Sequence, residues 1–171
     1  MNPIVRYKFW ITTLFLGVVC MAVPAQGTPV TDTSPASAIS KEPFFADVVK
    51  RARHLKFETE AFAKKPKLKL LAAPNFKAFV SDIRALSASD LQGHYTLKAR
   101  GTDNDLKCIL TGVSRDLILK IDALEAAKTQ AELTQGLTNL VDLLSDNIDV
   151  IVTPATVSSG LDCTIEFGKD A

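Results

Sequence analysis

Residues 103–124 read DNDLKCILTGVSRDLILKIDAL, and their apolar residues recur at intervals of three and four. This is the period of an amphipathic α-helix with one buried face. Asp103 is a good N-cap, and Asp105 adds negative charge at the positive end of the helix dipole. The apolar face comprises Leu106, Leu110, Val113, Leu117, Ile121 and Leu124. The stretch therefore predicts a capped helix that packs along its whole length.

Three other segments have the same period and complete the predicted fold. Two of them precede the helix at 103–124: residues 44–64 and a segment that begins at Asn75. Pro66 and Pro74 bracket the connection between these two segments. The last segment opens with the capping box Thr129–Glu132 and ends before Pro154. Because the connections are mostly short, neighbouring helices must be antiparallel. We therefore expect an all-α fold, an up-down four-helix bundle.

The segment 87–100 is the ambiguous part of the chain. Ser89 and Gln92 have the spacing of a capping box, which would restart a helix, so we expect helix with a kink or break near 87–93. Tyr95, Leu97 and Ala99 instead alternate with polar residues, as they do in a strand. The alternative fold is therefore α+β, with a small hairpin at 94–112.

The N-terminal residues have the layout of a secretory signal peptide. Arg6 and Lys8 precede an apolar run at 9–19, and small residues follow it. We assign 1–25 to a signal peptide, 26–42, rich in Pro, Ser and Thr, to a flexible leader, and 43–171 to the bundle domain. The predicted location is periplasmic or extracellular, with membrane contact only during export through the signal peptide.

Two cysteines remain after signal cleavage, Cys108 and Cys163. An exported chain with two cysteines most simply forms one disulfide. At 100° per residue, Cys108 shares a helix face with Gly112 and Leu119 rather than with Leu110. We expect a Cys108–Cys163 bridge that pins the C-terminal tail across the helix.

The charge distribution indicates possible binding surfaces. Without Arg6 and Lys8, the chain has 18 basic and 19 acidic residues, a balance that argues against nucleic-acid binding. The basic residues gather in the first half, and the acidic residues dominate the last helix. Candidate contacts for a partner or ligand are Lys64, Lys65, Lys67, Lys69, Asp142, Asp146 and Asp149. Solvated faces and complementary packing of the two halves are the alternatives.

The sequence contains no recognisable catalytic or metal-binding motif. The sequence has no nucleophile elbow, phosphate-binding glycine loop or zinc-protease motif, and its two histidines, His54 and His94, are poorly spaced for a shared haem. We expect no enzyme activity, no metal site and no cofactor. Two functions remain: an exported module that docks a protein partner as an inhibitor, immunity factor or accessory subunit, or a carrier of an apolar molecule such as a fatty acid within the bundle.

Overall fold

The computed structural model describes residues 36–101 and 104–153, and every element in these ranges is helical. The elements are α1 (Ala36–Ile39), α2 (Pro43–Ala63), the 3-10 helix η1 (Leu68–Ala72), α3 (Pro74–Arg100), α4 (Asn104–Glu125) and α5 (Gln130–Val152). The predicted helical bundle is thus confirmed. The alternative hairpin at 94–112 is wrong, because α3 continues to Arg100 and α4 begins at Asn104. The predicted signal peptide, most of the leader, Asp103 and Cys163 lie outside the described residues.

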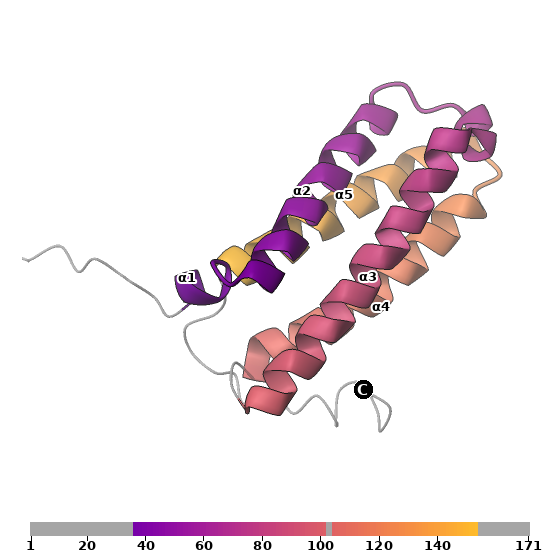
Figure 1. The fold of residues 1–171 in the computed structure, drawn as a ribbon. Coiled ribbons are helices and arrows are strands. Elements are labelled where there is room, and N and C mark those ends of the chain that lie inside the picture. Colours follow the sequence, from indigo (N-terminus) through magenta and orange to yellow (C-terminus); the bar gives the residue numbers. More distant parts are fainter. Residues whose placement is uncertain (1–35, 102–103, 154–171) are drawn as a thin grey trace, which may run out of the picture. The chain divides into compact units, whose positions relative to one another are not determined.

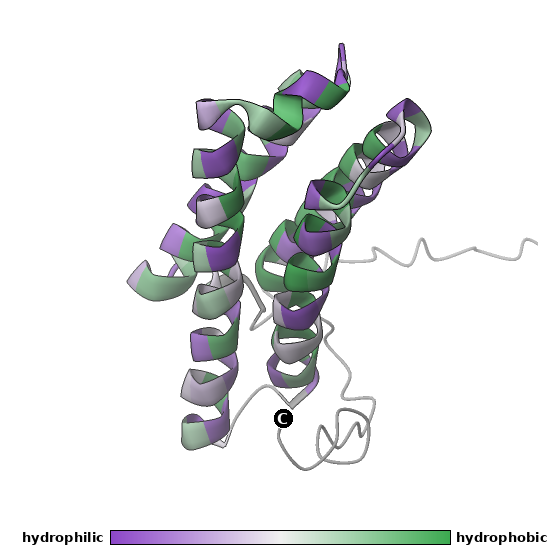
Figure 2. Ribbon diagram, turned by 90° about the vertical axis from the view of Figure 1, so that its right-hand side faces the viewer, coloured by the Kyte–Doolittle hydropathy of each residue, from purple (hydrophilic) through white to green (hydrophobic). Residues whose placement is uncertain are grey.

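The four long helices pack as two pairs (Figure 1). The most extensive contacts join α3 to α4 and α2 to α5, while α4 also packs along α5 and α2 contacts α3 less extensively. The short helix α1 falls in the segment predicted as a leader, and it contacts α5. Along each helix, apolar and polar residues alternate with the helical period (Figure 2). This pattern places one face of every long helix in a shared core.

The ends of the helices follow from local sequence. Pro74 occupies the first turn of α3, where the missing N–H costs no hydrogen bond. Gly101 ends α3 in the left-handed conformation, with φ of 67°. The capping box of α5 is formed as predicted: Glu132 N donates to Thr129 Oγ1 at 3.2 Å, and Thr129 N donates to Glu132 Oε2 at 3.0 Å. These caps fix where the connections lie at the ends of the bundle.

Helix α3 is continuous, so the break predicted near 87–93 is wrong. Ser87, Asp90 and Gly93 of this segment are buried in the bundle. Gly93 marks a close approach of three helices, because an added Cβ would lie 3.1 Å from Leu110 Cδ1 and 3.2 Å from Phe45 Cε1. Packing between helices therefore keeps this segment helical and buried, although its local sequence is polar.

No helix in the described part of the chain combines the length and the apolar character that crossing a bilayer requires.

Candidate functional site

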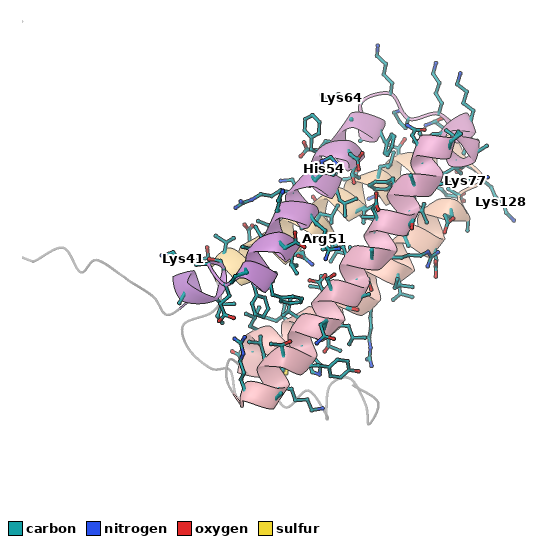
Figure 3. All side chains as sticks on the ribbon, viewed as in Figure 1. Lys41, Arg51, His54, Lys64, Lys77 and Lys128 are labelled. Carbon is teal, nitrogen blue, oxygen red and sulfur yellow. The ribbon has the colours of Figure 1, made fainter. Side chains whose placement is uncertain are left out.

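One end of the bundle carries a concentration of positive charge. Both the α2–α3 connection and the α4–α5 connection lie here, since Gln130 Nε2 donates to Pro66 O at 3.0 Å. We call this region the basic end and define it by Lys64, Lys65, Lys67, Lys69, Lys77 and Lys128. Figure 3 shows Lys64, Lys77 and Lys128 at this end.

None of the six lysines makes an ion pair with a described acidic residue. Residues 61–81 contain five of them and no Asp or Glu. Glu132 lies in the first turn of α5, beside the α4–α5 connection. Backbone N–H groups of Lys128 and Thr129 donate to its carboxylate and, together with the charge of Lys128, lower its pKa. The positive charge of the basic end is therefore largely uncompensated within the described chain.

A pocket of about 330 Å³ opens at the basic end. Its apolar wall is supported from below, because the Phe62 ring packs edge-on against Phe76 and Phe79 with centroid distances of 5.9 and 5.2 Å. The lining residues are Ala61, Phe62, Lys65, Lys67, Lys69, Leu70 and Ala73. Three of the four lysines predicted as contacts thus surround one apolar depression.

The three predicted acidic contacts lie elsewhere. Asp142, Asp146 and Asp149 are all exposed along α5. Asp149 shares a surface groove of about 310 Å³ with Arg53 and Lys56 of α2. The structure therefore does not bring the acidic and the basic candidates into one site.

The predicted disulfide cysteine of α4 is buried. Cys108 is 1% exposed, whereas Arg115 and Leu119, which follow it along the same stripe, are exposed. Its predicted partner lies outside the described residues.

A polar centre that the sequence did not predict lies in the middle of the core. Asn147 Nδ2 of α5 donates to Asp90 Oδ2 of α3 at 2.6 Å, and both residues are fully buried. On α2, Arg51 Nη2 donates to Ser89 Oγ at 2.7 Å, and Arg51 Nε lies 3.0 Å from Asp47 Oδ2. The centre thus joins the two helix pairs through hydrogen bonds.

Two contacts fix the register between α3 and α4 at this level. Ser87 Oγ donates to Ser114 O at 2.7 Å, and His94 Nδ1 bonds Lys107 O at 2.8 Å. A carbonyl only accepts, so Nδ1 carries the hydrogen. In this antiparallel register Asp90 lies level with Thr111. Among the described residues, the buried side-chain atoms at the polar centre without a hydrogen-bond partner are Asp90 Oδ1, His94 Nε2, Thr111 Oγ1, Asn147 Oδ1 and Arg51 Nε, the last of which lies in the ion pair with Asp47.

Burial changes the protonation of Asp90. Desolvation raises its pKa from 3.8 to about 7, against the opposing effects of the Asn147 hydrogen bond and the Arg51 charge. The residues of this centre occupy the apolar stripes of their helices: Asp90 follows Ile83 and Leu86, and Asn147 follows Leu140 and Leu144. The heptad positions of Asp90 and Asn147 indicate burial, although polar side chains usually lie on the surface.

Neither a metal cluster nor a similar protein indicates a function for the described residues. The described ranges contain no cluster of three or more His, Cys, Asp or Glu residues that could hold a metal ion. Comparison of the chain with protein-family models, with curated proteins and with solved structures finds no significant match.

Proposed function

We propose that the protein is an exported, non-enzymatic binding module that docks an acidic protein partner through its basic end. The observation that carries the proposal is the group of six lysines without an ion-pair partner among the described acids. Uncompensated charge of one sign attracts and orients a partner of the opposite sign. A partner of the inhibitor, immunity or accessory-subunit type fits this mode of docking.

The alternative, a carrier of an apolar molecule within the bundle, has less support. Such a carrier needs an apolar cavity between its helices. The middle of this core holds Asp90, Asn147 and Thr111 instead, all buried. The pockets described above open on the surface. We therefore favour the docking module.

Export changes the covalent structure of the chain in two ways. We infer that residues 1–25 are removed and that Cys108 and Cys163 then form a disulfide that holds the tail on α4. The burial of Cys108, on a stripe where Arg115 and Leu119 are exposed, supports this pairing. An oxidising compartment outside the cytoplasm would allow the bond to persist.

Binding measurements with matched charge variants test the docking proposal. The partner is first identified by crosslinking in the native host, purified, and titrated with the mature protein at low and high salt. We expect the combined variant Lys64→Gln, Lys65→Gln, Lys67→Gln and Lys69→Gln to bind at least ~10-fold more weakly and with less salt dependence, since steering by charge is lost.

The acidic face of α5 supplies the control. The combined variant Asp142→Asn, Asp146→Asn and Asp149→Asn should bind as tightly as the wild-type protein, because these residues lie outside the basic end. The docking proposal fails if the aspartate variant loses affinity while the lysine variant keeps it.

A further inference from the structure

We propose that the pocket at the basic end receives a large apolar side chain from an acidic segment of the partner, whose acidic residues on either side meet the lysines. This inference rests on the proposed function and adds the chemistry of the segment that is recognised.

The apolar part of the pocket is built before any partner binds. Phe62 is held by the two rings beneath it, and hydrogen bonds within η1 fix the opposite wall: Leu70 N donates to Lys67 O at 2.8 Å, and Ala73 N donates to Leu70 O at 2.9 Å. A volume of about 330 Å³ is near the lower end of the range for ligand pockets. A preformed concavity of this size suits one aromatic or large aliphatic side chain, which loses little entropy on binding.

The lysines around the pocket indicate a segment with several acids. Lys65, Lys67 and Lys69 line the pocket itself, while Lys64, Lys77 and Lys128 extend the charge over the end of α2, the start of α3 and the α4–α5 connection. A small amphiphile with one carboxylate would leave most of these charges without a partner. A peptide segment with acids on both sides of an apolar residue matches both the charge and the concavity.

A membrane surface fits this geometry less well. A protein that binds an anionic bilayer usually inserts protruding apolar side chains among the lipids. Here Leu68 of η1 is 39% exposed, but Phe62 and Leu70 are only partly exposed and line a depression. A bilayer would cover the lysines and leave the pocket empty, so we favour a protein segment.

Titration with two synthetic peptides, followed by the amide NMR resonances of the mature protein, tests the inference. Both peptides carry the same Asp and Glu residues; one has a central Phe and the other a Ser in its place. We expect the Phe peptide to bind at least ~10-fold more tightly, the equivalent of about 1.4 kcal/mol, and to shift the resonances of Phe62 and Leu70.

Filling the pocket provides a matched pair of variants. Ala61→Leu places a larger side chain at the pocket, and Ala46→Leu adds the same group at another exposed position of α2. Ala61→Leu should reduce the affinity for the Phe peptide to that for the Ser peptide, and Ala46→Leu should change neither. Leu70→Gln, which makes one wall polar, is a second variant with the same expected loss.

Four outcomes would overturn the inference. Equal affinities of the two peptides, with shifts confined to the lysines, would leave docking by charge but exclude the apolar anchor. Full binding of the Phe peptide by Ala61→Leu and Leu70→Gln would place the anchor elsewhere. Binding to phosphatidylglycerol vesicles without binding of either peptide would make the basic end a membrane surface. If neither the peptides nor the identified partner shifted the amide resonances of the basic end, the proposed function would be excluded as well.

Discussion

The protonation of Asp90 links the stability of the bundle to pH. The carboxyl is fully buried, and its pKa is about 7 in the folded protein against 3.8 for the ordinary group. Because the folded pKa is the higher one, the folded state binds the proton more tightly. The resulting stabilisation is complete below about pH 4 and is lost as the pH rises to about 7. The Arg51 guanidinium opposes this loss, because its charge lowers the pKa of Asp90. Asp47 on α2 pairs with Arg51 and offsets part of that charge.

Replacement of Asp90 by Asn should remove this pH dependence. Between pH 4 and pH 8 the wild type should lose at most about 4 kcal/mol of unfolding free energy relative to Asp90→Asn. The variant is therefore favoured at high pH. Urea denaturation across this range measures it. The exposed Asp82→Asn on the same helix is the control and should follow the wild type. Parallel curves for wild type and Asp90→Asn would show that Asp90 is ionised as in an ordinary exposed carboxyl.

At the scale of elements, glycine allows α4 and α5 to approach closely. A Cβ at Gly136 would lie 2.6 Å from Leu124 Cδ1, well inside van der Waals contact. Leu124 is fully buried, so its side chain has little room to move. Glycine costs α5 about 1 kcal/mol of helix propensity relative to alanine, and the close packing of the two helices offsets this cost.

A double-mutant cycle separates these two effects. Gly136→Ala should destabilise the wild-type protein by roughly 1–3 kcal/mol, because the new methyl group overpacks the contact. In a Leu124→Ala background the same substitution should stabilise the protein by about 1 kcal/mol, since only the propensity gain remains. Thermal and urea unfolding of the four proteins measure the cycle. Additive effects would contradict the contact between Gly136 and Leu124.

At the scale of the whole molecule, the proposed Cys108–Cys163 bond would close a loop of 55 residues. The chain-entropy relation gives about 4 kcal/mol of stabilisation for a loop of this length. Reduction, or the substitution Cys163→Ser, should therefore lower the stability of the mature protein by a few kcal/mol. Cys163→Ser should not respond further to reductant, which provides the control.

Intact mass of protein purified from its host tests the covalent part of this prediction. We expect a mass lower by two hydrogen atoms before reduction than after it, together with loss of residues 1–25. Two free thiols in the freshly exported protein would exclude the bridge.

The helices themselves could be predicted from the sequence. The stripe Leu106, Leu110, Val113 predicted α4, and Thr129 with Glu132 predicted the start of α5, because helical period and capping are properties of local sequence. The lysines around Pro66 were also found, since a run of charge is visible without a fold. The sequence did not predict which of these lysines border a pocket. The wall contributed by Leu70 and Ala73 depends on how η1 packs near Phe62.

The sequence by itself determined four amphipathic helices and the concentration of lysines between two of them, since both depend on residues close together in the chain. Only the tertiary structure decided that α3 runs unbroken and that Asp90 lies inside the bundle. That outcome depends on groups distant in sequence, namely the amide of Asn147 and the guanidinium of Arg51. A buried carboxyl is tolerated only where such partners are present, and which partners are present is fixed when the helices pack.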